Sequence, residues 1–176
     1  MQRKILYISG SPRQGNCEYI LNQIKKELGG ELVLLREHNL KYCHGCLHCH
    51  TVPTCSIKTD NGNLLLDKAI SADLLVVAIP NYFDNVPGLF KVFNDRMHPL
   101  GFNKAWQGKD VILIFVGSST IADSTKHVML GALTGAIRYY RLNVLDTFVT
   151  KALNYNDSFG NYRFIDDAIS KIRKHL

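Results

Sequence analysis

The chain has 176 residues, of which 46% are hydrophobic and 20% are charged, so a disordered chain is excluded and one folded domain over residues 1–176 is expected. The net charge is +6, but Lys and Arg are scattered, which favours a solvated basic surface over a nucleic-acid-binding one. No apolar run approaches the roughly 20 residues of a membrane helix, and the first residues do not resemble a signal peptide. We therefore expect a soluble, cytoplasmic protein.

Apolar runs and helical periods alternate along the chain. We expect strands at residues 4–10, 31–35, 73–80, 110–119 and 142–149. Helices are expected at residues 17–28, 62–71, 86–97 and about 124–140, and at the end of the chain, where Ile165, Ile169, Ile172 and Leu176 share one face. Continuous apolar strands joined by helices predict an α/β fold: a flavodoxin-like, doubly wound, five-stranded parallel sheet with the order 2-1-3-4-5.

The loop after the first strand, "SGSPRQGNC" from Ser9 to Cys17, combines polar side chains with the start of a helix. It offers two serine hydroxyls, Arg13 and Asn16. Free N–H groups and the positive dipole end at a helix N-terminus attract phosphate. The loop contains neither a Walker A sequence nor a Gly-x-Gly-x-x-Gly sequence. It favours a phosphate loop over a plain polar turn.

Two further loops should meet the first at the carboxyl ends of the strands. In "PNYFDNVPG", residues 80–88, Tyr82 and Phe83 could lie against a planar ring, or they could cover the core. The loop "GSSTIADS", residues 117–124, has small residues that permit close backbone approach. Three polar loops that converge at the switch point of a parallel sheet predict a ligand site.

The segments "GSPRQGN" and "AIPNYFDNVPGLFKVFNDR", with a cysteine-rich segment between them, resemble the NADPH-dependent FMN reductase family over about residues 4–118. More narrowly, they resemble its iron–sulfur flavoprotein branch. The resemblance implies bound FMN, NAD(P)H as co-substrate and a homodimer or homotetramer. It also implies electron transfer through the flavin to a small-molecule or protein acceptor. A flavodoxin-like electron carrier that does not oxidise NAD(P)H is the alternative, and the basic charge favours the enzyme.

Carried over by position, the resemblance assigns roles to the three loops. The phosphate would be held by Ser9, Ser11, Arg13, Asn16 and Cys17, although Cys17 stands where relatives often have Thr or Ser, a better donor. The flavin ring would be lined by Pro80, Asn81, Tyr82, Phe83 and Asn85 and closed on its other side by Gly117, Ser118 and Ser119. No catalytic residue is assigned, because hydride transfer belongs to the cofactor.

The segment "CHGCLHCHTVPTC" holds four of the five cysteines at the spacing C-x2-C-x2-C-x5-C, namely Cys43, Cys46, Cys49 and Cys55. Four thiolates at this spacing suit an iron–sulfur cluster, and the resemblance implies a [4Fe-4S] cluster. Zinc, with His44, His48 or His50 as alternative ligands, and a loop without metal remain open. Structural disulfides are disfavoured in a reducing cytosol.

Overall fold

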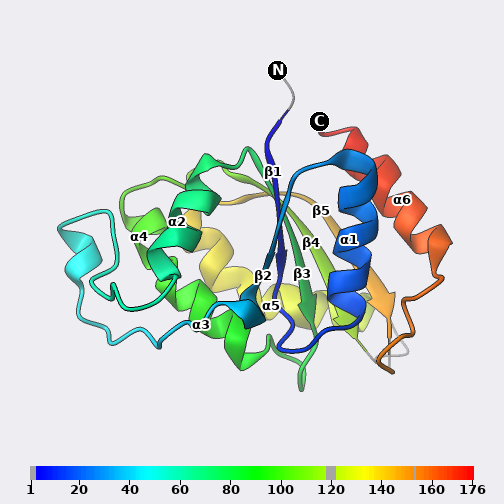
Figure 1. The fold of residues 1–176 in the computed structure, drawn as a ribbon, viewed down its shortest axis with the longest axis horizontal. Helices are drawn as coiled ribbons and strands as arrows, with labels where there is room; N and C mark the ends of the chain where they lie inside the picture. The colour runs from blue at the N-terminus through cyan, green and yellow to red at the C-terminus, as the bar shows by residue number, and fades with distance from the viewer. Residues whose placement is uncertain (1–2, 118–121, 153) are drawn as a thin grey trace.

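The structure is a computed structural model that describes residues 3–117, 122–152 and 154–176 (Figure 1). Its centre is a five-stranded sheet in which all paired strands are parallel, in the order β2-β1-β3-β4-β5. The strands are β1 (Ile5–Ser9), β2 (Glu31–Leu34), β3 (Leu74–Pro80), β4 (Asp110–Gly117) and β5 (Asn143–Lys151). The predicted fold class and strand order are confirmed.

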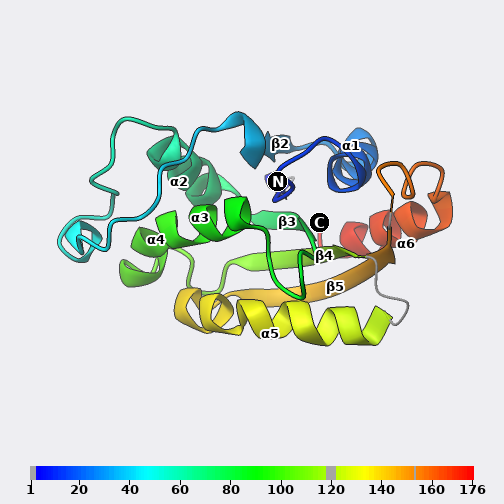
Figure 2. The same ribbon diagram turned by 90° about the horizontal axis from the view of Figure 1, so that it is seen from below.

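Helices cover both faces of the sheet (Figure 2). One face carries α1 (Asn16–Leu28) and α6 (Tyr162–Arg173). The other carries α2 (Gly62–Ser71), α3 (Gly88–Arg96), α4 (His98–Phe102) and α5 (Ala122–Tyr140). Two short 3-10 turns, η1 (Leu35–Glu37) and η2 (His48–His50), lie between β2 and α2. None of the helices within the described ranges is long and apolar enough to cross a bilayer.

Alternation of side chains along the strands explains why their sequences are continuously apolar. In β1, Ile5 and Tyr7 pack against α1 and α6, whereas Leu6 and Ile8 pack against the helices of the opposite face. All four side chains are buried. Because both faces are covered, these four positions of β1 lose water on folding, which stabilises the fold by roughly 1.5–3 kcal/mol per large apolar side chain.

Several element boundaries differ from the sequence prediction. The third helix begins at Gly88, with Pro87 as its N-cap, and ends at Arg96. A separate short helix, α4, follows with Pro99 in its first turn, where a missing N–H costs nothing. The fifth strand continues to Lys151, and Leu176 lies beyond the end of α6 with 38% of its surface exposed.

A buried ion pair closes the segment between β2 and α2. Asp60 and Arg96 have side chains that are 1% and 0% exposed, and their closest atoms, Oδ2 and Nη1, are 2.5 Å apart. A second bond joins Arg96 Nη2 to Asp60 Oδ1 at 3.0 Å, and Arg96 also donates to the carbonyls of Lys41 and Ile57. Bidentate geometry of this kind is the strong form of an arginine–carboxylate pair.

The electrostatic environment of Asp60 follows from this arrangement. Burial pushes the pKa of its carboxyl upward, but hydrogen bonds from Arg96 and from the N–H groups of Lys41 and Gly62 outweigh burial and hold the pKa at about 2. Gly62 is required beside the pair, because a Cβ there would lie 2.3 Å from Arg96 Nη2. The start of α2 is therefore shaped around the ion pair.

We predict that Asp60→Asn lowers the free energy of unfolding by about 3–5 kcal/mol, since it leaves a buried guanidinium without its counter-charge. Urea unfolding measures this loss, and Asp95→Asn is the matched control because the Lys91–Asp95 pair is exposed and should contribute less than about 1 kcal/mol. The folded-state pKa of Asp60 is depressed. Its stabilisation is therefore present above about pH 4 and lost as the pH falls through about 2. Equal losses in the two variants would contradict the prediction.

Candidate functional site: a cleft at the switch point and a cysteine-lined hollow

A cleft of about 190 Å³ opens at the carboxyl ends of β1, β3 and β4, where the strand order reverses. This is the edge at which doubly wound sheets bind ligands. The loop after β1 and the loop after β3 form most of its wall, and β4 and the segment after β5 complete it. Its lining residues are Ser11, Arg13, Asn16, Cys17, Pro80, Asn81, Tyr82, Val116, Gly117 and Ala152.

The first helix starts at this cleft. Gly15 is its N-cap, has φ +151° and supplies no capping side chain. The first N–H groups of a helix have no acceptor within the helix, and they carry the positive end of the helix dipole. Here the first turn begins with Asn16 and Cys17, both of which line the cleft. The local geometry therefore suits an anion, and the phosphate site stays a prediction.

Close backbone packing brings the cleft walls together. Gly10 donates its N–H to the carbonyl of Ala78 at 2.8 Å, and a Cβ at Gly10 would lie 2.7 Å from the Phe90 ring. On the other wall, a Cβ at Gly117 would lie 3.2 Å from Cβ of Asn81. Glycine at both positions lets adjacent loops approach each other at the strand ends.

Three polar side chains of the first loop, those of Ser11, Arg13 and Asn16, have partners within the protein. Ser11 donates its hydroxyl to the carbonyl of Arg13 at 2.8 Å, which tightens the turn. The guanidinium of Arg13 stands 5.7 Å from the centre of the Tyr155 ring. Asn16 donates to the carbonyl of Asn154 at 2.8 Å and accepts from the N–H of Ser158 at 3.0 Å. Asn16 thus fastens the loop after β5 to the loop after β1.

The loop after β3 forms a tight turn. Tyr82 and Asn85 exchange two backbone hydrogen bonds of 2.8 and 3.1 Å, and the residues between them, Phe83 and Asp84, have φ of 55° and 58°. Left-handed backbone is strained for a bulky side chain such as Phe. Phe83 is fully exposed at the tip, while Tyr82 points its half-exposed ring along the cleft wall.

Most of the predicted binding residues come together, and some do not. The cleft contains Ser11, Arg13, Asn16, Cys17, Pro80, Asn81, Tyr82 and Gly117. Ser9 is fully buried at the end of β1, and its hydroxyl has no hydrogen-bond partner among the described residues. Phe83 and Asn85 belong to the turn beside the cleft rather than to its lining, and Ser118 and Ser119 lie outside the described residues. The role of each of these residues stays a prediction.

Sequence reasoning missed the segment after β5. Ala152 lines the cleft, and Asn154 and Tyr155 contact the first loop. The signal was available, because all strands of a parallel sheet end at the same edge and the segment after the fifth strand must reach it as well.

Cys17 differs chemically from the other cysteines. It is 2% exposed, and burial raises the pKa of its thiol to about 12, against the opposing effect of nearby Arg13. It therefore stays protonated at neutral pH and offers a weak donor to the cleft.

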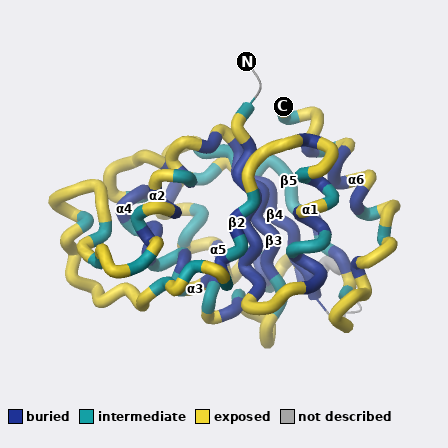
Figure 3. The backbone as a smooth tube through the Cα atoms, in the orientation of Figure 1, coloured by how far each residue is buried: buried dark blue, intermediate teal, exposed yellow. Residues whose placement is uncertain are grey.

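The other four cysteines belong to a separate, outward-facing segment. This segment extends beyond α2 and α4 (Figure 1) and is mostly exposed (Figure 3). All four line one hollow of about 220 Å³, together with apolar Leu47, Ile57 and Pro99 and with Arg96 of the buried ion pair. Within the described ranges, this hollow shares no lining residue with the cleft. The predicted metal ligands are thus brought together at a site of their own.

The cysteine hollow offers the type of ligand that an iron–sulfur cluster requires. In a cubane each thiolate binds a different iron, so the sulfurs must surround a space rather than meet at a point. The four cysteine residues line one hollow rather than lying in separate places. Arg96 contacts Cys55, and although burial lowers the pKa of the guanidinium, its hydrogen bonds to Asp60 and Cys55 outweigh burial and raise it. A fixed positive charge therefore borders the thiolate site.

The thiols also differ in acidity. A hydrogen bond with Ser56 at 3.2 Å, and then the N–H of His48, lower the pKa of exposed Cys46. Burial, and then the neighbouring thiolates, raise the pKa of Cys49. Metal binding requires deprotonated sulfur, so the surroundings of Cys46 favour the thiolate form more than those of Cys49 do.

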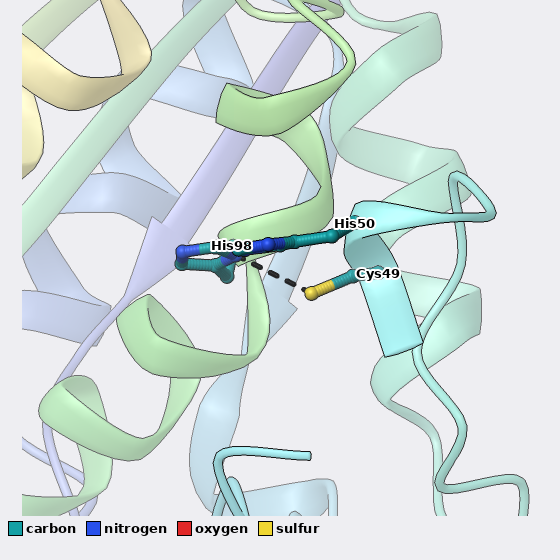
Figure 4. A group of neighbouring side chains, drawn as sticks. All are labelled: Cys49, His50 and His98. Carbon is teal, nitrogen blue, oxygen red and sulfur yellow. Dashed lines mark hydrogen bonds between the residues drawn. The ribbon is translucent and has the colours of Figure 1, made fainter. Parts of the chain in front are cut away.

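Cys49 has a second set of neighbours. Its Sγ lies 3.3 Å from Nδ1 of His98, the first residue of α4 (Figure 4). His50 stacks on His98 with ring centres 5.3 Å apart, and the potential ligand atoms of the three residues all lie within 4.8 Å of one another. Burial, and then nearby His50, lower the pKa of His98, which favours a neutral imidazole. His98 is a single histidine in an apolar helical segment, and no sequence pattern singled it out.

Comparisons with known proteins agree with this geometry. The family model described as NADPH-dependent FMN reductase matches residues 3–140. An iron-sulfur flavoprotein of Clostridioides difficile (strain 630) is 28% identical over 97% of this chain and 75% of its own length. An iron-sulfur flavoprotein of Archaeoglobus fulgidus is 38% identical over 53% of this chain, which corresponds to 48% of the relative.

Among solved structures, the apo form of an NADH:FMN oxidoreductase superposes with a TM-score of 0.66 and 20% identity, covering 99% of this chain and 90% of the other. At 20% sequence identity, this structural similarity shows that the two proteins share a fold.

Proposed function

Because the chain belongs to the NADPH-dependent FMN reductase family, we propose that it binds FMN in the cleft and passes electrons from NAD(P)H through the flavin to an acceptor. The observation that carries the proposal is the cleft itself, which joins a helix N-terminus, Arg13 and the wall formed by Asn81 and Tyr82 at one strand edge. The relatives named iron–sulfur flavoproteins support the proposal that this chain binds a flavin.

The protein's own groups would bind and orient the cofactor. Backbone N–H groups at the start of α1, with Arg13 and Ser11 beside them, offer donors and positive charge to a phosphate. Asn81 offers amide groups to the polar edge of a ring, and the Tyr82 ring offers a flat apolar surface. Bound flavin supplies two-electron and one-electron chemistry, so the protein needs to supply position and electrostatics rather than a general base.

We further propose that Cys43, Cys46, Cys49 and Cys55 hold a [4Fe-4S] cluster. Support comes from the single hollow that all four thiols line, from Arg96 at its border, and from the names of the relatives. Such a cluster would give the flavin a one-electron partner. Since the hollow and the cleft lie on separate parts of one chain, electron exchange between them fits a homodimer or homotetramer in which a neighbouring chain supplies the other site.

We predict that Arg13→Ala weakens FMN binding by about 1.5–3 kcal/mol, or roughly 10–150-fold, because one charge-assisted contact to phosphate is lost. Fluorescence titration of FMN measures the change. Arg173→Ala is the matched control, since Arg173 is an exposed arginine at the far end of α6 and its loss should leave affinity unchanged. Equal affinities in the two variants would remove the first loop from the binding site.

We predict that NADH or NADPH bleaches the absorbance of the bound flavin in the absence of oxygen within a catalytic turnover time, because the proposed reaction begins with hydride transfer to FMN. Stopped-flow absorbance measures the rate, with dithionite as the control reductant. If dithionite bleaches the flavin and neither nicotinamide does, the chain is an electron carrier instead.

We predict that anaerobic reconstitution with iron and sulfide gives about four irons per chain and that Cys46→Ala and Cys49→Ala each lose most of them. Iron and acid-labile sulfide analysis checks this. Cys17→Ala is the matched control, because Cys17 is the one cysteine that lines the cleft rather than the hollow, so iron content should be retained. Equal iron in Cys46→Ala and in the unmodified chain would contradict a cluster at this segment.

A further inference from the structure

Cys49, His50 and His98 form a compact set of metal ligands, and the two histidines are not ligands of the proposed cluster. Cys49 and His50 come from η2, and His98 comes from the start of α4. Their ligand atoms lie within 4.8 Å of one another (Figure 4). We propose that Cys49, His50 and His98 form a mononuclear site for zinc or a chemically similar divalent ion. The ion occupies this site when the chain carries no cluster.

The spacing of the atoms fits one ion. Zinc binds sulfur at about 2.3 Å and imidazole nitrogen at about 2.0–2.1 Å, so tetrahedral geometry places two such ligand atoms about 3.6 Å apart. The observed distance between Cys49 Sγ and His98 Nδ1 is 3.3 Å. All three ligand atoms lie within 4.8 Å of one another, so a tetrahedral ion would draw the more distant pairs together by roughly 1–1.5 Å at most.

A stack of four rings holds the two imidazoles in place. Phe102 stacks on His50 with centres 4.3 Å apart and planes inclined by 2°, and His50 stacks on His98 at 5.3 Å. His98 then stacks on Tyr139 of α5 at 4.7 Å. Rings fixed by packing lose little conformational freedom on binding an ion, which favours affinity.

The chemistry of the donors selects the class of ion. One thiolate and two neutral imidazoles are the set that zinc and its borderline-soft neighbours prefer, and hard ions such as Mg²⁺ and Ca²⁺ prefer oxygen. The ion binds Cys49 as a thiolate, so the thiol proton is released on binding. Three protein ligands leave the fourth tetrahedral position for water or another small ligand.

Cys49 is a ligand in both proposed sites, so the mononuclear ion and the cluster cannot be bound to the same chain at once. Cys43 and Cys46 line the hollow but are not members of the three-residue set, whereas His98 lines the hollow and is also a member of the set. Zinc held here would withhold one thiolate from the cluster. The mononuclear site itself does not rest on the proposed cluster or on FMN binding, because its ligands are assembled in the chain as described.

The test is Co²⁺ and Zn²⁺ titration of the cluster-free, FMN-loaded protein. Co²⁺ bound to a thiolate gives a sulfur-to-metal absorption band, and Zn²⁺ competition gives the affinity. We expect one Co²⁺ per chain. Cys49→Ser and His98→Phe should weaken Zn²⁺ binding at least roughly 100-fold, since loss of a residue that only hydrogen-bonds to a metal ligand already costs about 10–100-fold. His98→Phe keeps a ring in the stack, so folding is preserved.

Three controls separate this site from the cluster. Cys43→Ser and Cys46→Ser should keep the Co²⁺ band while losing iron on reconstitution, and His127→Phe, at an exposed histidine outside both sites, should change neither. Failure of iron reconstitution in the unmodified chain would contradict the proposed cluster, but it would not affect the proposal of the mononuclear site. The proposal is overturned if His98→Phe binds Co²⁺ as the unmodified chain does, if the band disappears in Cys43→Ser, or if no Co²⁺ binds.

Discussion

The buried pair of Asp60 and Arg96 is the constraint on which the cysteine segment depends. The segment from Lys41 to Asp60 contains little secondary structure beyond the short turn η2, and ordering such a loop is entropically costly. Arg96 reaches from α3 to both ends of the segment, because it binds Asp60 and the carbonyl of Lys41. It also contacts Cys55, so one guanidinium closes the loop and borders the thiolate hollow.

The third helix links the two sites. Its N-terminal side follows the turn that carries Asn81 and Tyr82 at the cleft, and its last residue is Arg96 at the hollow. Phe90 and Phe93 of the same helix pack into the core, and Phe90 lies against Gly10 of the first loop. A helix anchored in the core through Phe90 and Phe93 thus joins the cleft at one end to the cysteine hollow at the other.

The strands and helices were predictable because each apolar period reports a covered face, as Leu6 and Ile8 show in β1. The cleft was predictable in outline, because parallel strands end at one edge. Three features were not read from the sequence. Asn16 binds the segment after β5 rather than standing free, Phe83 extends from a tight left-handed turn, and His98 reaches Cys49 across 49 positions. Each depends on tertiary contacts between segments whose separate patterns carry no sign of their partner.

The most direct test of this account is the iron and FMN content of Asp60→Asn after anaerobic reconstitution, measured at neutral pH and low temperature on chains whose circular dichroism shows that they remain folded. If the ion pair closes the cysteine segment, iron should fall to well below half of that in the unmodified chain while FMN stays near one per chain, since the cleft shares no described lining residue with the hollow. Full iron retention, or loss of FMN in parallel with iron, would contradict the claim that this pair holds the thiolate site.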